Sequence, residues 1–311
     1  MKEYININDI EDIPQTIQEA IELKKDPYQF KHLGTNKTLV MLFFNSSLRT
    51  RLSTEKAAKN LGMDVMVLNV SQTWNLEFED GTVMDLDKAE HIKEAAQVIS
   101  EYADIIAVRA FPSLTDKEKD QSEHVLKSFQ KYATVPVINM ESSTAHPLQA
   151  LADAITITEF TSKSKPKVVL SWAPHPKALP HAVANSFITM MQELEVDLHI
   201  THPKGYELDS DITKSATIEY DQKEAMKNAD FVYTKNWSSF SDYGKVLHSD
   251  PNWMIDQEKL GDAKFMHCLP VRRNVVVEDA VLDSSNSVVI QQAGNRTFSA
   301  QIVLKKLLEN L

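Results

Sequence analysis

Cysteine is nearly absent from this chain of 311 residues, in which Cys268 is the only one. A single cysteine excludes an intrachain disulfide and a zinc site built on several thiolates. Histidines are scattered, and no HExxH or paired-carboxylate motif occurs, so we expect no metal. No apolar run reaches the ~18 residues that span a bilayer, and the polar start "MKEYININDIEDIPQ" does not look like a secretory signal. We therefore expect a cytoplasmic protein without a membrane partner.

Positive charge is in the minority. The chain has 33 Lys and Arg against 44 Asp and Glu, a formal net charge of −11. This balance disfavours general nucleic-acid binding, which needs cations to neutralise phosphates, so no nucleic-acid partner is expected. Basic residues that cluster inside an acidic protein can instead concentrate a small anionic ligand.

Short apolar runs alternate with amphipathic segments, a pattern typical of parallel sheets buried on both faces. Strands are predicted at residues 38–44, 64–70, 104–111, 135–140, 167–173, 197–202, 217–221, 230–236 and 263–270. Helices are predicted at residues 47–62, 89–103, 120–133, 146–160, 182–195, 222–229 and 295–311.

The most linker-like stretch is "SKSKPK" at residues 162–167, after which the alternation restarts. The sequence therefore predicts an α/β protein with two doubly wound parallel-sheet domains joined by helices. Their expected ranges are 1–150 and 151–295. The C-terminal helix 296–311 is expected to pack back on the first domain.

Two arginines stand at the start of the helix predicted at 47–62, where the helix dipole already favours negative charge. The junction reads "SSLRTR", with Arg49 and Arg51 beside Ser47 and Thr50. A helix N-terminus offers backbone N–H groups, hydroxyls add donors, and an arginine can bind two oxygens. A phosphate is the expected ligand. The same sequence is also compatible with an N-cap serine followed by arginines that are simply exposed to solvent.

Other polar groups follow predicted strands, and the carboxyl ends of strands are where open parallel sheets bind ligands. Each alone also has an ordinary structural explanation. Trp74 lies in a polar stretch where a tryptophan has no obvious core role. Cys268 could be a nucleophile, a buried thiol or a group whose backbone carbonyl contacts a ligand, and we favour the last. The remaining candidates are Arg109, Glu141, His146, Gln149, His175, Lys235, Arg272 and Arg296.

Three motifs together resemble those of the aspartate/ornithine carbamoyltransferases. "SLRTR" resembles the family's phosphate-binding "STRTR", "HPLQ" its "HPxQ", and "HCLP" the same letters in its ornithine branch. They occur in the family's order across essentially the whole chain. The resemblance implies a carbamoyl-phosphate domain, an amino-acid domain and a crossing C-terminal helix. It also implies a homotrimer with sites at subunit interfaces, and no cofactor.

The resemblance implies roles for individual residues. Trp74 would come from the adjacent subunit, and Arg109, His146 and Thr50 would polarise the reacting carbonyl. The residues expected at carbamoyl phosphate are Ser47, Leu48, Arg49, Thr50, Trp74, Arg109, His146, Gln149, Cys268, Leu269 and Arg296. The residues expected at an acylated ornithine are Glu141, His175, Lys235, Arg272 and Ala89.

The acceptor is expected to be an acylated ornithine, because the "DxxSMG" loop for free ornithine is absent after Lys235. In "MDLDKAEHIKEA", the branch using N-acetylornithine carries a glutamate and the branch using N-succinylornithine a proline, where Ala89 stands here. Alanine removes a carboxylate that would repel the succinyl carboxylate. The sequence thus predicts carbamoyl transfer to the δ-amine of N-succinyl-L-ornithine, giving N-succinyl-L-citrulline and phosphate, in arginine biosynthesis. A shift of one residue would put Glu90 there and favour N-acetylornithine.

Other interpretations fit parts of the pattern. An anion-binding regulatory homologue without activity would not need all three motifs. An aspartate carbamoyltransferase would have a lysine in the loop of Trp74 and no "HCLP". A putrescine carbamoyltransferase would not need a cation at Lys235 for a carboxylate.

Overall fold

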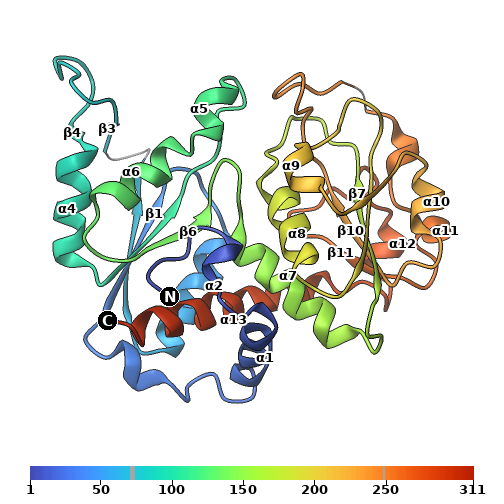
Figure 1. Ribbon diagram of the computed structural model, residues 1–311, viewed down its shortest axis with the longest axis horizontal. Coiled ribbons are helices and arrows are strands. Elements are labelled where there is room, and N and C mark those ends of the chain that lie inside the picture. Colours follow the sequence, from blue (N-terminus) through green and yellow to red (C-terminus); the bar gives the residue numbers. More distant parts are fainter. Residues whose placement is uncertain (71–73, 248) are drawn as a thin grey trace. The chain divides into compact units, whose positions relative to one another are not determined.

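A computed structural model describes residues 1–70, 74–247 and 249–311 (Figure 1). These residues form two units. Unit 1 comprises Met1–Ser113, Glu118–Leu148 and Arg296–Leu311, and unit 2 comprises Leu114–Lys117 and Gln149–Asn295. Each unit is built on one main parallel sheet, which confirms the predicted α/β class. Within the described ranges, no helix has the length and apolar character to cross a membrane.

The sheet of unit 1 has the strand order β2-β1-β5-β6. Its members are β1 (Thr38–Phe43), β2 (Asp64–Asn69), β5 (Ile105–Arg109) and β6 (Val137–Glu141), all parallel. The chain passes from β1 to β2 on one side and then returns to β5 on the other side of β1. The direction of winding therefore switches between β1 and β5, the position where doubly wound sheets bind ligands.

Apolar residues at helical spacing cover this sheet. In α4 (Ile92–Tyr102) they are Ile92, Ala95, Ala96 and Ile99, which are buried in one core cluster with strand residues. The other elements of unit 1 are η1 (Ile7–Asp9), α1 (Ile13–Leu23), η2 (Lys31–Gly34), α2 (Arg49–Asn60), β3 (Leu76–Glu77), β4 (Glu90–His91), α5 (Lys117–Gln121) and α6 (His124–Tyr132).

The helix predicted from residue 89 begins later than expected. Residues Glu90–His91 form β4, which pairs in parallel with β3, and α4 starts at Ile92. His91 caps the helix, because its Nδ1 accepts a hydrogen bond from Lys93 N at 3.2 Å. Glu90 fits a helical pattern in the sequence, but the pairing with β3 and the cap at His91 place it before the helix.

Unit 2 repeats the winding with the strand order β11-β10-β7-β8-β9. Its switch point lies between β7 and β10, where Trp172 and Lys235 are paired in register. Its strands are β7 (Lys167–Trp172), β8 (Asp197–Thr201), β9 (Thr217–Glu219), β10 (Phe231–Lys235) and β11 (Lys264–Met266). Its helices are α8 (Ala182–Gln192), α9 (Ser210–Thr213), α10 (Gln222–Met226), η3 (Pro251–Trp253), α11 (Gln257–Leu260) and α12 (Asp279–Leu282).

Two long helices belong to both units, and α5 also begins at Lys117 of unit 2. α7 (Pro147–Phe160) leaves unit 1 after Leu148, and α13 (Val289–Leu308) enters unit 1 at Arg296. Gln301 of α13 accepts a hydrogen bond from Asn60 of α2 at 2.8 Å, which confirms that the C-terminal helix packs on the first unit. The expected helix start at residue 295 was wrong. The buried face of α13 carries Gln292, Asn295 and Arg296, so the apolar period that marks a helix is missing there.

Candidate active site

The start of α2 lies at the switch point of unit 1. Leu48 is the N-cap residue and provides no side-chain cap, while Ser47 Oγ accepts a hydrogen bond from Thr50 N at 3.3 Å. Backbone N–H groups in a first helical turn have no partner inside the helix. Together with the guanidinium of Arg49 at the first helical position, this turn suits an anion.

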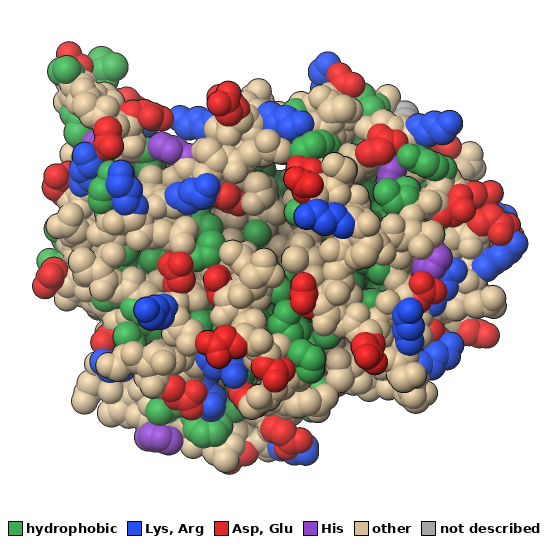
Figure 2. All heavy atoms as spheres, viewed as in Figure 1, with side chains coloured by type: hydrophobic (Ala, Val, Ile, Leu, Met, Phe, Trp, Pro, Cys, Tyr) green, Lys and Arg blue, Asp and Glu red, His purple; other side chains and the backbone are tan. Residues whose placement is uncertain are grey.

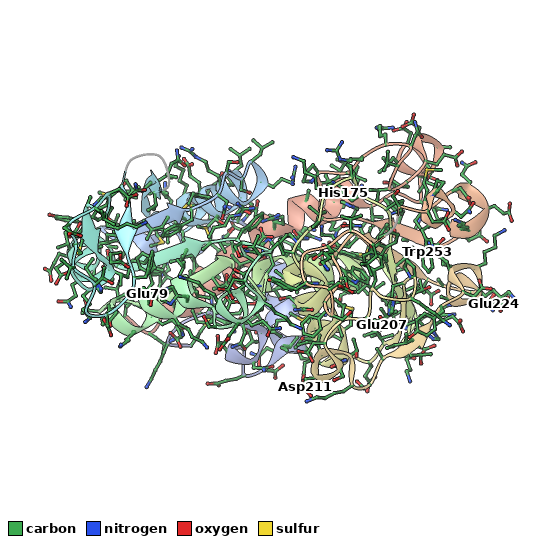
Figure 3. The ribbon with its side chains drawn as sticks, turned by 90° about the horizontal axis from the view of Figure 1, so that it is seen from above. Glu79, His175, Glu207, Asp211, Glu224 and Trp253 are labelled. Carbon is green, nitrogen blue, oxygen red and sulfur yellow. The ribbon has the colours of Figure 1, made fainter. Side chains whose placement is uncertain are left out.

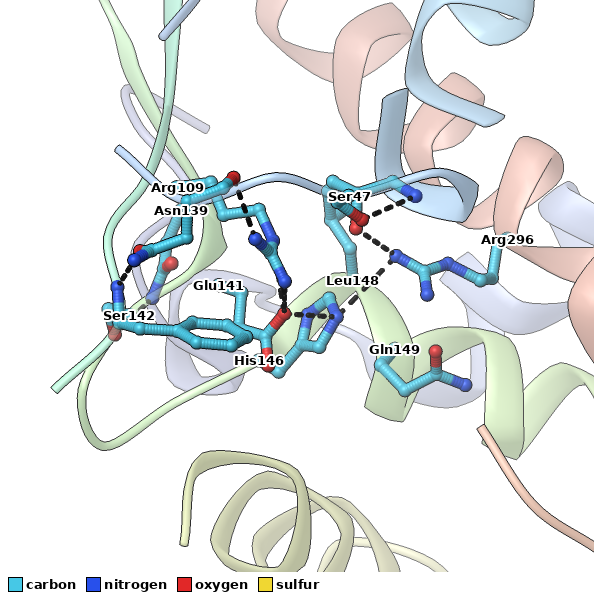
Figure 4. A network of polar contacts seen from close by, with 12 residues as sticks. Ser47, Arg109, Asn139, Glu141, Ser142, His146, Leu148, Gln149 and Arg296 are labelled. Atoms are coloured by element: carbon cyan, nitrogen blue, oxygen red, sulfur yellow. Dashed lines mark hydrogen bonds and ion pairs between the residues drawn. The ribbon is translucent and has the colours of Figure 1, made fainter. Parts of the chain in front are cut away.

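Arg109 is fixed at the same edge of the sheet (Figure 4). Its Nη1 donates to the carbonyls of Asn45 and Ser46, each at 2.9 Å. Its Nε and Nη2 donate to Glu141 Oε2 at 3.2 and 3.0 Å. The guanidinium at the end of β5 is thereby held between the segments that follow β1 and end β6. Only 6% of the Arg109 side chain and 10% of the Glu141 side chain is exposed.

A second arginine extends this network. Arg296 Nη2 donates to Thr50 Oγ1 at 2.7 Å and lies 3.5 Å from His146 Nε2. The same His146 nitrogen lies 3.5 Å from Glu141 Oε2 (Figure 4). Thr50, His146, Glu141, Arg109 and Arg296 therefore form one buried polar cluster. The cluster contains two guanidinium groups and one carboxylate, so it suits the binding of a phosphate.

In unit 2, three cationic or basic side chains gather at the ends of β7, β10 and β11. Arg272 Nε donates to His175 Nε2 at 3.1 Å, and His175 Nδ1 lies 2.9 Å from the carbonyl oxygen and 3.1 Å from the backbone nitrogen of Lys177. His175 is labelled in Figure 3. Burial lowers the pKa of His175, and the charges of Arg272 and Lys235 lower it further. A neutral imidazole between two cations suits the binding of a carboxylate.

The "HCLP" segment follows β11. His267 N donates to Gln292 Oε1 at 2.9 Å, and His267 Nδ1 accepts from Leu269 N at 2.8 Å. These bonds hold Leu269 in the left-handed region at φ +55°, a conformation that costs a non-glycine residue about 1–3 kcal/mol. Cys268 is half-buried. Backbone strain at a predicted ligand-binding position is typical of functional sites.

Trp74 and Ala89 belong to adjoining segments of unit 1. Ala89 N donates to the carbonyl of Asn75 at 2.9 Å, just before β4 pairs with β3. Trp74 packs, partly buried, against a core cluster of unit 1, so the expectation that it has no core role was wrong. Ala89 itself is exposed.

The structure divides the predicted site residues between the units. Glu141 lies in unit 1 against Arg109, whereas its expected partners in acyl-ornithine binding, His175, Lys235 and Arg272, lie in unit 2. Unit 1 also contains Ser47, Leu48, Arg49, Thr50, Trp74, Ala89, Arg109, His146 and Arg296. Unit 2 contains Gln149, Cys268 and Leu269 as well.

Two buried polar residues beside these groups, Asp153 and Gln292, were not predicted from the sequence. Asp153 follows Gln149 by four residues, a spacing that puts both on one face of α7 and could have drawn attention to it. Gln292 gives no such signal, because its partners are distant in the sequence. In the described part of the chain, no group of three or more His, Cys, Asp or Glu side chains is placed to hold a metal ion.

Two parallel sheets with cationic groups at their switch points form an arrangement that suits anionic small molecules. Residues 2–159 match the family model for the aspartate/ornithine carbamoyltransferase carbamoyl-P binding domain. Residues 180–307 match the model for the Asp/Orn binding domain of the same family. The chain belongs to the aspartate/ornithine carbamoyltransferase family and is a carbamoyltransferase.

Individual relatives are similar over their full length. The chain is 49% identical to an N-succinylornithine carbamoyltransferase of Bacteroides fragilis (strain 638R), covering 100% of both chains. It is 37% identical to an N-acetylornithine carbamoyltransferase of Xylella fastidiosa (strain Temecula1), covering 99% of this chain and 98% of the relative. A solved structure of an N-acetyl-L-ornithine transcarbamylase mutant, complexed with carbamyl phosphate and N-succinyl-L-norvaline, is similar with a TM-score of 0.92. It is 37% identical, over 99% of this chain and 100% of that one.

Proposed function

We propose that the protein transfers the carbamoyl group of carbamoyl phosphate to the δ-amine of N-succinyl-L-ornithine. The products are N-succinyl-L-citrulline and phosphate, a step of arginine biosynthesis in the cytoplasm. The observation that carries the proposal is the 49% identity to N-succinylornithine carbamoyltransferases over the whole chain. The 37% identity to an N-acetylornithine carbamoyltransferase makes N-acetylornithine the second candidate acceptor.

The acyl group would be selected near Ala89. In the similar solved structure, N-succinyl-L-norvaline is bound by a mutant in which a glutamate is replaced by alanine. Ala89 offers no carboxylate to a succinyl group, whereas the neighbouring Glu90 lies in β4. Ala89 is exposed just before the strand, whereas Glu90 is half-buried within it, so the two side chains have different surroundings. This supports the succinyl substrate if Ala89 faces the acyl group.

The polar cluster of unit 1 would bind and activate carbamoyl phosphate. Ser47 and the first turn of α2 would hold the phosphate, while Arg109, His146 and Thr50 would stabilise negative charge on the carbonyl oxygen. The neutral δ-amine forms a bond to the carbonyl carbon, the bond from carbon to the phosphate oxygen breaks, and the departing phosphate takes the amine proton. His175, Lys235 and Arg272 would bind the carboxylates of the acceptor.

Rates with three acceptors test the choice of substrate. Labelled carbamoyl phosphate is offered with N-succinylornithine, N-acetylornithine or ornithine, and kcat/KM is compared. We expect the succinyl substrate to be preferred. Ala89→Glu should lower kcat/KM for it by about tenfold or more, since 1.4 kcal/mol of repulsion suffices for a factor of ten.

Glu90→Ala is the matched control at the neighbouring position. It should leave the preference for the succinyl substrate unchanged if Ala89 faces the acyl group. A preference for N-acetylornithine that Glu90→Ala reverses would instead assign the acyl pocket to Glu90 and contradict the proposed substrate.

A homotrimer with sites at subunit interfaces also belongs to the proposal. The loop between β3 and β4 exposes apolar side chains at its tip, visible as green spheres at the upper left of Figure 2. Val83 is 77% exposed and Leu86 is 86% exposed. Exposed apolar groups that gather in one place often mark a contact with another chain. Sedimentation equilibrium should give three times the 35.2 kDa chain mass, and a monomer would contradict this part.

A further inference from the structure

Asp153 is a completely buried carboxylate in the middle of α7. Its Oδ1 accepts a hydrogen bond from Gln149 Nε2 at 2.7 Å, one helical turn earlier. The same oxygen accepts from Gln292 Nε2 of α13, also at 2.7 Å. Two amide donors, one from α7 and one from α13, therefore converge on one carboxyl oxygen, which fixes both amides.

These bonds decide which end of the Gln149 carboxamide is left for a ligand. Gln149 donates to Asp153 through its NH2 group, so the amide oxygen faces away from Asp153. The side chain is 1% exposed. Within the described ranges, Gln149 Oε1 has no hydrogen-bond partner. A buried amide oxygen without a donor is energetically unfavourable, and an N–H donor on a ligand would satisfy it.

The carboxamide of Gln292 connects Asp153 to the "HCLP" segment. Gln292 Oε1 accepts a hydrogen bond from His267 N at 2.9 Å. His267 Nδ1 in turn accepts from Leu269 N at 2.8 Å. One carboxylate is therefore linked to two segments that the family resemblance assigns to the carbamoyl NH2 group.

We propose that Asp153 is a positioning residue for carbamoyl transfer. It fixes the Gln149 carboxamide so that its oxygen accepts an N–H of the carbamoyl group, and through Gln292 it fixes the backbone at 267–269. This inference rests on the proposed function, in which Gln149 contacts carbamoyl phosphate. In chemical terms, the ligand of Gln149 is a phosphate compound that carries an NH2 group on its carbonyl carbon.

Two anions, one with and one without that donor, test the inference directly. Inorganic phosphate lacks the NH2 group, whereas carbamoyl phosphate carries it. Asp153→Leu keeps the approximate shape but accepts no hydrogen bond, so calorimetry should show carbamoyl phosphate binding about tenfold weaker, equivalent to about 1.4 kcal/mol. Phosphate affinity should stay within about threefold of wild type, the margin left by small packing effects. Equal losses for both anions, or no loss for either, would overturn the inference.

Asp153→Asn and Asp153→Ala complete the series. Asparagine keeps an acceptor oxygen, so it should restore most of the discrimination between the two anions. If Asp153→Leu does not fold, the same two affinities are measured with Asp153→Ala. Alanine leaves a small cavity and does not place apolar atoms against the two amides. Alanine that discriminates as wild type does would contradict the proposal.

Thr156→Val is the matched control, because Thr156 is equally buried on α7 and also bonds to α13. Its Oγ1 accepts a hydrogen bond from Asn295 Nδ2 at 2.9 Å, but it contacts neither Gln149 nor Gln292 through any of the hydrogen bonds described. The valine variant should lose thermal stability and keep the wild-type ratio of carbamoyl phosphate to phosphate affinity. A changed ratio would mean that the loss of any buried hydrogen bond between α7 and α13 alters the discrimination between the two anions.

A double-mutant cycle with Gln149→Ala shows whether Asp153 acts through Gln149. In the alanine background, Asp153→Leu should weaken carbamoyl phosphate binding far less than in wild type, since neighbours that act together are not additive. Equal effects in both backgrounds would contradict the proposed route. Because these assays need no acceptor, they still decide the role of Asp153 if no acylated ornithine is carbamoylated, an outcome that would refute only the proposed function.

Discussion

At the residue scale, Arg109 combines an ion pair with backbone contacts. It donates to Glu141 and to the carbonyls of Asn45 and Ser46, and the ion pair is almost completely buried. Removing one partner of a buried pair leaves an uncompensated charge, which typically costs about 3–5 kcal/mol. Removing the charges of both partners avoids the cost of an uncompensated buried charge.

We therefore expect Arg109→Ala to lose both stability and activity. The free energy of unfolding should fall by about 3–5 kcal/mol, because Glu141 stays buried and charged. Adding Glu141→Gln should restore much of that stability without restoring turnover, since no guanidinium remains to stabilise the carbonyl oxygen. Denaturant titration and kcat/KM separate the two effects. Turnover that recovers in the double variant would limit Arg109 to neutralising Glu141.

At the element scale, the loop between β6 and α7 depends on one carboxylate from another helix start. Glu123, the N-cap residue of α6, has φ +55°. Its Oε1 accepts from Ser142 Oγ and Thr144 N at 2.7 Å each, and its Oε2 accepts from Ser143 N at 3.2 Å. This loop connects Glu141 to His146, so Glu123 sets the path between two members of the polar cluster.

Glu123→Ala should therefore weaken carbamoyl phosphate binding while the protein stays folded. The loss of several charge-assisted bonds, worth about 1.5–3 kcal/mol each, should lower kcat/KM about tenfold or more. Glu123→Gln keeps one acceptor oxygen and should fall between alanine and wild type. Glu118→Ala, an exposed glutamate of α5, is the control and should match wild type. Wild-type kcat/KM in Glu123→Ala would show that the loop holds its shape without this carboxylate.

The sequence predicts the strand-end groups well, because parallel sheets bring the ends of neighbouring strands together. Ser47, Thr50, Arg109, His146 and Arg296 were expected in one site, and in the structure they lie in one network. Their roles in catalysis stay predictions.

Carboxylates that support the site were not found in advance. Glu123 lies 19 to 21 residues before the groups that it binds, and no local pattern marks such a contact. The true start of α13 was missed because polar side chains occupy its buried face. Both failures arise where hydrogen bonds between distant segments, and not apolar periodicity, determine the structure.

At the scale of the whole molecule, proton uptake should weaken unit 2 first. Burial lowers the pKa of three of its histidines, His175, His181 and His202. His181 Nε2–H donates to the carbonyl of Ser238 at 2.8 Å, and His202 Nδ1–H donates to that of Pro203 at 2.9 Å. Each imidazole is thus held in its neutral form by its surroundings.

The sign of the pH dependence follows from these shifts. Unfolded histidines titrate near pH 6.5, and the folded ones only at lower pH. Between these values the unfolded chain binds protons that the folded chain does not, so stability rises with pH and is lost as pH falls below about 6.5. We expect the free energy of unfolding to decrease steadily from pH 7 to pH 5. Tryptophan fluorescence reports mainly on unit 2, because Trp172, Trp237 and Trp253 lie in it.

Substitutions that keep an N–H donor but remove the titrating imidazole show whether these histidines cause the loss of stability at low pH. His181→Gln places an amide N–H near the position of Nε2, and His202→Asn does so for Nδ1. Each substitution should reduce the change in the free energy of unfolding between pH 5 and 7, and the two together should reduce it more. His32→Gln, at an exposed position in η2 of unit 1, is the control for the loss of an imidazole as such. A profile that keeps its full slope in the double variant would place the acid sensitivity outside these two buried imidazoles.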